Sequence, residues 1–119
     1  ALFHSDNVYK IPNFRGVGHI CITNTGSNTA FRGFGGPQGL LICETWMDHL
    51  ASALSLRPEE LRLRNLYDFE GSVTHFFQRL ERCPVQRMFK ELTESSEFER
   101  RLAEAESFNK QNRWRKRGM

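Results

Sequence analysis

The sequence predicts an α+β fold, in which strands come first and several helices follow. Residues 2–25 have an extended pattern that includes a β-branched-rich run at residues 17–23. From residue 37 onward, apolar residues recur instead at helical spacing. A third observation is the glycine-rich segment that separates the two patterns, because it marks the change from one kind of structure to the other.

The extended region is divided by a proline and ends in a turn. Pro12 interrupts it, because proline cannot donate a hydrogen bond to a strand ladder. Residues 17–23, with the sequence VGHICIT, are then expected to form a strand. Residues 24–28, NTGSN, have the composition of a turn.

Four helices are expected after the glycine-rich segment. The first runs from about Pro37 to Leu54, because proline suits the start of a helix and the apolar residues behind it share one face. The second begins at Pro58, followed by two glutamates that suit a helix N-terminus. The third opens at Pro84. The fourth runs from about Glu97 to Arg113 and carries an apolar stripe.

Composition excludes several classes of protein. The chain has 119 residues and a formal net charge of +3, and its length fits one domain or part of one. No apolar run approaches the ~18–20 residues that span a bilayer, so no membrane segment is expected. The three cysteines form no C-x-x-C pair and the four histidines no i, i+4 pair, which argues against an iron–sulfur or zinc site.

Two charged groups have an ordinary interpretation. The basic cluster at residues 113–117, RWRKR, could meet a phosphate backbone, but it is typical of a solvated helix end. Glu44 and Asp48 fall on one face of the first expected helix, and we interpret them as solvated surface carboxylates.

The most unusual segment is FRGFGG at residues 31–36, which places three glycines within four residues. Glycine is costly in regular structure, so such a cluster indicates positive φ angles or a close approach of the backbone to another group. The segment is neither a dinucleotide fingerprint nor a P-loop. Gln38 stands where the third glycine of the fingerprint belongs, and the turn has no lysine.

Residue chemistry alone leaves two interpretations of this turn open. Arg32 is a permanent cation suited to an oxyanion or metal-oxo group, and Phe34 could lie against a flat ligand. Alternatively, Phe31 and Phe34 fill the core and Arg32 pairs with a carboxylate.

A family resemblance favours the first interpretation. Residues 28–38, NTAFRGFGGPQ, resemble the signature of the molybdenum hydroxylases, the xanthine dehydrogenase/aldehyde oxidase family. The resemblance continues through FH-x-DN-x-YKIPN-x-RG at residues 3–16, ETWM at 44–47, TH-x-FQRLE at 74–81 and FNK-x-N-x-W-x-KRG at 108–118. The pair Gly35–Gly36 resembles the xanthine-type enzymes, since aldehyde-oxidase types often carry a bulkier second residue.

The resemblance implies a role for each residue of the turn. Arg32, Phe31 and Gly33 would contact the molybdenum–molybdopterin cofactor, and Phe34 would stack on a purine substrate. No residue here would bind the metal directly. No catalytic residue is expected in this chain either, because the family's general-base glutamate would lie downstream.

The resemblance also implies a larger enzyme. Residues 1–119 would be part of the second molybdopterin-binding subdomain, with the catalytic region continuing on both sides, and would be inactive alone. The complete enzyme would oxidise hypoxanthine to xanthine to urate by hydroxylation at an electron-poor carbon. It would also carry [2Fe-2S] clusters, FAD and NAD, form a homodimer, and be cytoplasmic or, alternatively, peroxisomal. An aldehyde oxidase-type enzyme and a phosphate- or nucleic-acid-binding module are the alternatives.

Overall fold

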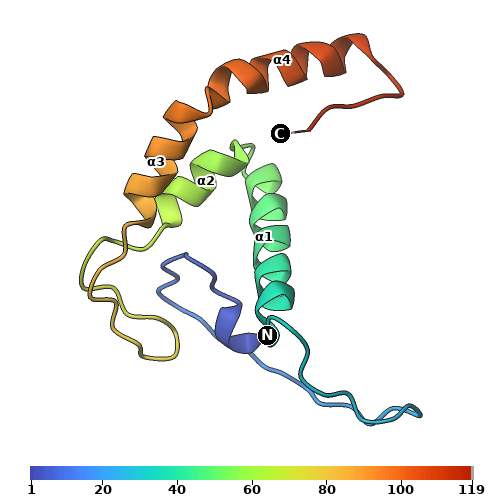
Figure 1. Ribbon diagram of the computed structural model, residues 1–119, viewed down its shortest axis with the longest axis vertical. Coiled ribbons are helices and arrows are strands. Elements are labelled where there is room, and N and C mark those ends of the chain that lie inside the picture. The colour runs from blue at the N-terminus through green and yellow to red at the C-terminus, as the bar shows by residue number, and fades with distance from the viewer. Residues whose placement is uncertain (119) are drawn as a thin grey trace. The chain divides into compact units, whose positions relative to one another are not determined.

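The computed structural model describes residues 1–118, which form two compact units, residues 1–86 and the residues from Arg87 onward. Its elements in order are a 3-10 helix η1 (Leu2–His4) and the α-helices α1 (Gly36–Ala53), α2 (Pro58–Asn65), α3 (Val85–Ser95) and α4 (Phe98–Gln111) (Figure 1). The first unit holds η1, α1 and α2, and the second holds most of α3 and all of α4.

The prediction of an α+β fold is wrong for the described residues. Residues 1–118 contain no strand, and only two isolated bridges form, between Tyr9 and Leu66 and between Val73 and Arg79. In the run at residues 17–23, Ile20 is fully exposed. β-branched residues favour a strand only where a neighbouring strand pairs and packs with them, and the described residues supply no such neighbour for this run.

The helix predictions are confirmed, with ends displaced by one or two residues. α1 begins at Gly36, so Pro37 is its second residue and needs no hydrogen bond from its missing N–H. α2 begins at Pro58, as expected, and carries two acidic residues in its first turn. In α2, the side chain of Asn65 donates to the Leu61 carbonyl oxygen at 2.7 Å, which shows that the two share a face.

The core of the first unit lies where α1 packs against α2 and η1. The buried face of α1 consists mostly of small residues spaced three or four apart: Gly36, Gly39, Cys43, Met47 and Ala51. Small side chains on this face let neighbouring backbone come close to the helix. The core of this unit also contains the buried residues Tyr9, Leu61, Leu66 and Tyr67.

The second unit is held partly by the return of its basic tail onto α4. The Asn109 side chain bonds the backbone of Arg117 in both directions, donating to its carbonyl oxygen at 2.9 Å and accepting from its N–H at 2.8 Å. The Arg117 guanidinium lies 4.1 Å from the centre of the Phe108 ring. Part of the basic cluster is therefore occupied in contacts with α4.

Candidate functional site

The glycine-rich segment forms two successive turns that lead into α1. The N–H of Phe34 donates to the Phe31 carbonyl oxygen at 2.9 Å, and the N–H of Gly36 donates to the Gly33 carbonyl oxygen at 2.7 Å. Gly33 and Gly35 have φ angles of 85° and 84°, in the left-handed region that favours glycine. We call residues 31–36 the glycine turn.

Two of the three glycines are required by the conformation of the chain itself. A Cβ atom at Gly33 would lie 2.7 Å from the ring of Pro37, and one at Gly35 would lie 2.6 Å from the backbone nitrogen of Ala1. Gly36 differs, because a Cβ there would meet only the His4 ring, at 3.8 Å. The conformation of the chain thus explains the glycines at positions 33 and 35 without any ligand. At position 36 the surrounding atoms would allow a side chain.

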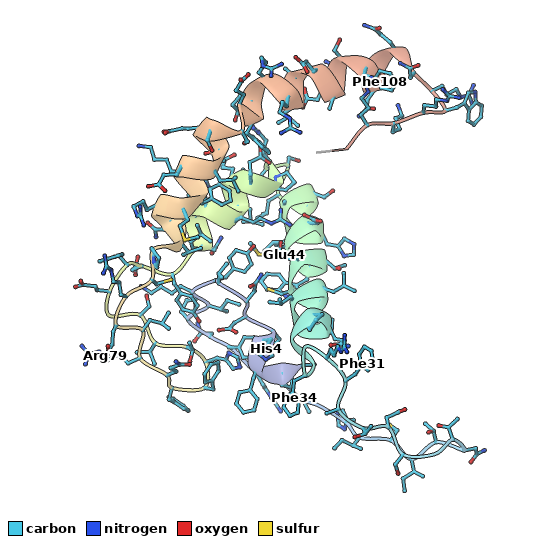
Figure 2. All side chains as sticks on the ribbon, in the orientation of Figure 1. His4, Phe31, Phe34, Glu44, Arg79 and Phe108 are labelled. Carbon is cyan, nitrogen blue, oxygen red and sulfur yellow. The ribbon has the colours of Figure 1, made fainter. Side chains whose placement is uncertain are left out.

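The side chains of the glycine turn are exposed. Phe31 is 81% exposed and Phe34 is 78% exposed, so neither belongs to the core of the described residues. Both lie at the N-terminal end of α1 (Figure 2). Arg32 is exposed and has no ion-pair or hydrogen-bond partner among residues 1–118. The alternative of core phenylalanines and a paired arginine is therefore not what residues 1–118 form.

The backbone of Phe34 is in an uncommon conformation. Its φ of 48° is left-handed, which is rare for a bulky residue and costs about 1–3 kcal/mol. Such residues gather at functional sites, but the feature is not sufficient, because Phe77 has a φ of 66° and is 90% exposed in another loop. What distinguishes Phe34 is its place beside Arg32, at the start of α1.

A carboxylate cluster in the middle of α1 corrects the interpretation of Glu44 and Asp48 as solvated surface carboxylates. Glu44 Oε1 accepts from the Tyr9 hydroxyl at 2.6 Å and from Asn7 Nδ2 at 2.9 Å. Its Oε2 accepts from Arg62 Nε at 2.7 Å, and Arg62 Nη2 donates to Asp48 Oδ1 at 2.7 Å. Glu44 and Asp48 are therefore both paired with α2, and Glu44 also with the N-terminal segment. We call these residues the Glu44 cluster.

The cluster and its surroundings shift several pKa values. Burial would raise the pKa of Glu44, but the hydrogen bonds from Tyr9, Arg62 and Asn7 outweigh it and hold the pKa below the ordinary value of 4.5. Burial, reinforced by the bond to Glu44, raises the pKa of Tyr9. Burial also raises the pKa of the Cys43 thiol to about 11, so the thiol is protonated at neutral pH.

A second carboxylate, that of the buried Asp6, also holds the N-terminal segment. Asp6 is 3% exposed, and its Oδ2 accepts from the Tyr67 hydroxyl at 2.6 Å. His75 Nδ1 lies 3.1 Å from the same oxygen, although not in hydrogen-bonding geometry. The His75 ring lies 4.4 Å from the ring of Phe14. A neighbouring hollow of about 450 Å³ is lined by Leu2, Phe3, Phe14, Arg15, Gly16 and His75, and not by the glycine turn.

Two kinds of site are not found among the described residues. Residues 1–118 contain no group of three or more His, Cys, Asp or Glu side chains that could hold a metal ion. In the same part of the chain, no helix combines the length and apolarity needed to cross a membrane. Cys21, Cys43 and Cys83 are free thiols.

Comparison with known proteins identifies the class. Residues 1–66 match the family described as the molybdopterin cofactor-binding domain, and the chain belongs to this family. Over all 119 residues it is 54% identical to xanthine dehydrogenase 2 of Arabidopsis thaliana, 54% identical to xanthine dehydrogenase/oxidase of Mus musculus and 56% identical to xanthine dehydrogenase/oxidase of Gallus gallus. The resemblance to the molybdenum hydroxylases is thereby confirmed. The chain spans 9% of the length of each of these relatives.

Proposed function

We propose that this chain is part of the second molybdopterin-binding subdomain of a molybdenum hydroxylase that oxidises purines. The observation that carries the proposal is the glycine turn, where the unpartnered Arg32 lies between two exposed phenylalanines at the start of α1. Membership of the molybdopterin cofactor-binding family supports the cofactor, and the names of the relatives support an oxidoreductase acting on xanthine.

The residues of the glycine turn fit a flat, anionic group such as molybdopterin. Arg32 supplies a permanent charge and a planar fork of donors, which suits phosphate or metal-oxo oxygens. Phe31 offers an exposed ring. Gly33 has no side chain, so its backbone can come close to a ligand that lies against this ring. Arg32, Phe31 and Gly33 would therefore hold the cofactor. When bound, the molybdenum cofactor supplies the hydroxylation chemistry, while the protein orients the reactants.

Phe34 would form a wall of the substrate site. A ring stacked on a purine contributes about 0.5–1.5 kcal/mol beyond the area it buries. It also limits the orientations of the substrate, which is how positioning favours reaction. The left-handed backbone of Phe34 supports this role, because a strained conformation of a bulky residue needs a reason outside local sequence preference.

The pair Gly35–Gly36, which resembles the xanthine-type enzymes, supports a purine rather than an aldehyde as the substrate. Gly36 would act indirectly, because it is buried on α1 and a Cβ there would face the His4 ring at 3.8 Å.

The remaining parts of the reaction would come from the rest of the polypeptide. The chain contributes no catalytic group of its own in this proposal. The general-base glutamate, the iron–sulfur clusters, FAD and the NAD site would lie in other segments of a homodimeric cytoplasmic enzyme.

The proposal is tested by Phe34→Ala in the complete enzyme. We expect kcat/KM for xanthine to fall about 2- to 10-fold, which corresponds to the loss of the stacking free energy given above. The molybdenum content of the enzyme should be unchanged. Phe77→Ala is the matched control, because Phe77 is also exposed and also has a left-handed φ, but lies away from the turn. Unchanged purine kinetics in Phe34→Ala, or an equal loss in Phe77→Ala, would reject the proposal.

A further inference from the structure

We propose that Glu44 is a positioning residue for the glycine turn, acting through Asn7 and Tyr9 on the N-terminal segment that supports the turn. This inference rests on the proposed function, since it concerns the same Phe34 wall. Glu44 does not belong to the turn. It lies nine residues after Gly35, or about 13 Å along α1 at ~1.5 Å per residue.

The N-terminal segment touches the glycine turn at backbone distance. A Cβ at Gly35 would lie 2.6 Å from the nitrogen of Ala1, and one at Gly39 would lie 2.5 Å from the Ala1 carbonyl oxygen and 3.0 Å from His4 Cβ. The backbones approach so closely that only glycine fits at these positions. The position of residues 1–4 therefore limits the positions that the turn can take. Figure 2 shows His4 and Phe34 near the same end of α1.

The contact at Ala1 is linked to the middle of α1 by a stiff piece of chain. Successive backbone turns connect residues 1–9, with the N–H of His4 donating to Ala1, that of Asn7 to His4 and that of Tyr9 to Asp6, at 3.0, 3.2 and 3.0 Å. The Asn7 and Tyr9 side chains then bond Glu44 Oε1. A displacement at Glu44 is therefore passed along this segment to Ala1.

Glu44 is itself held in place from the opposite side. Its Oε2 accepts from Arg62, whose guanidinium is also bound by Asp48. Arg62 follows Leu61, which is buried in the core at 6% exposure. Both carboxylate oxygens are thus occupied, and the side chain joins α1, α2 and the N-terminal segment at one point.

Phe34 needs such support more than an ordinary turn residue does. A bulky residue keeps a left-handed backbone only where surrounding contacts enforce it. The contact of Ala1 with Gly35, the next residue, is such a constraint. Without the Glu44 bonds, the N-terminal segment keeps its Asp6–Tyr67 hydrogen bond but loses its side-chain hydrogen bonds to α1. The turn can then relax, and the ring can leave the orientation that stacks on the substrate.

The test is a double-mutant cycle in the complete enzyme, using xanthine as the probe. If Glu44 affects the substrate through the position of the Phe34 ring, Glu44→Ala should lower kcat/KM by no more than Phe34→Ala does, about 2- to 10-fold. In the Phe34→Ala background, Glu44→Ala should cause less than about a twofold further loss, because coupled residues are not additive. Molybdenum content should stay at the wild-type level.

Tyr9→Phe is assayed in the same cycle, because it removes only one hydroxyl from the Glu44 cluster and keeps the shape of the core. It should give a smaller loss with the same non-additivity. Glu60→Gln is the matched control, since Glu60 pairs with Arg64 on the surface of α2, and its kinetics should equal those of the wild type.

The outcomes separate this inference from the proposed function. If Phe34→Ala lowers kcat/KM but Glu44→Ala and Tyr9→Phe are without effect, or their losses multiply with that of Phe34→Ala, the positioning role is refuted and the stacking wall stands. A loss of molybdenum that parallels the loss of activity in both variants would show a general structural role and would also refute the inference. If Phe34→Ala itself has no effect, the proposed function fails first.

Discussion

The glycine turn and the Glu44 cluster lie on the same helix but use their polar and aromatic groups in opposite ways. In the turn, Phe31 and Phe34 are exposed, and Arg32 has no partner among residues 1–118. In the cluster, both oxygens of Glu44 are bonded, and Arg62 is shared between two carboxylates. The polar groups of the cluster are satisfied within the chain, whereas the described residues leave the cation and the two rings of the turn exposed.

This difference separates residues that build the fold from residues that are available for binding. A buried polar group without a partner is costly, so a cluster that supports the fold is satisfied internally. A binding surface must instead keep its donors and rings free until the ligand arrives, and it tolerates local strain such as that at Phe34. On this basis we propose that Arg32 and Phe34 are binding residues and that Glu44 is a supporting one.

The largest difference is expected between two adjacent glycines of the turn. Gly35→Ala should destabilise the complete enzyme by at least about 1–3 kcal/mol. The φ of residue 35 is left-handed, and the added Cβ would collide with Ala1. Gly36→Ala should change stability by less than about 1 kcal/mol, because the position is helical and has room. Thermal unfolding of the two variants compares them, and equal melting temperatures would contradict the support of the turn by Ala1.

A smaller difference is expected between the two tyrosines that bond the carboxylates. Tyr67→Phe should cost about 1–3 kcal/mol, because it deprives the buried Asp6 carboxylate of its 2.6 Å hydrogen bond. Tyr9→Phe should cost about 0.5–1.5 kcal/mol, because Glu44 keeps Asn7 and Arg62. Denaturant unfolding of the complete enzyme measures both costs. A larger cost at Tyr9 would show that the bonds from Asn7 and Arg62 do not compensate Glu44 for the lost hydroxyl.

The smallest effect is expected from acid. The pKa of Glu44 is lowered in the folded protein, so its carboxylate stabilises the fold fully above its unfolded pKa, near 4.5. This contribution is lost as the pH falls below 4.5 and through the lowered folded pKa. The stability difference between wild type and Glu44→Gln should therefore shrink on acidification over this range. A difference that stays constant with pH would mean that the charge of Glu44 does not contribute.

Local patterns in the sequence predicted the helices and drew attention to the glycine turn. The apolar spacing after Pro37 and the proline at position 58 are local signals, and they place α1 and α2 within a residue or so. The unusual composition of residues 31–36 likewise identified a turn with positive φ angles.

Features that depend on distant partners could not be predicted in this way. The strand expected at residues 17–23 requires a neighbour that the described residues do not provide. Glu44 looked like a surface carboxylate because its partners, Tyr9 and Arg62, lie 35 and 18 residues away in the chain. Its position directly after the buried Cys43, with an arginine on the next helix, is the signal that could have indicated a paired residue.

A crystal structure of the complete enzyme with a bound purine would show directly whether Arg32 and Phe34 have the proposed roles. We predict that the face of the Phe34 ring lies against the purine and that the Arg32 guanidinium faces the molybdenum cofactor. A structure in which the glycine turn is enclosed by protein, with both residues remote from the molybdenum centre, would contradict this account.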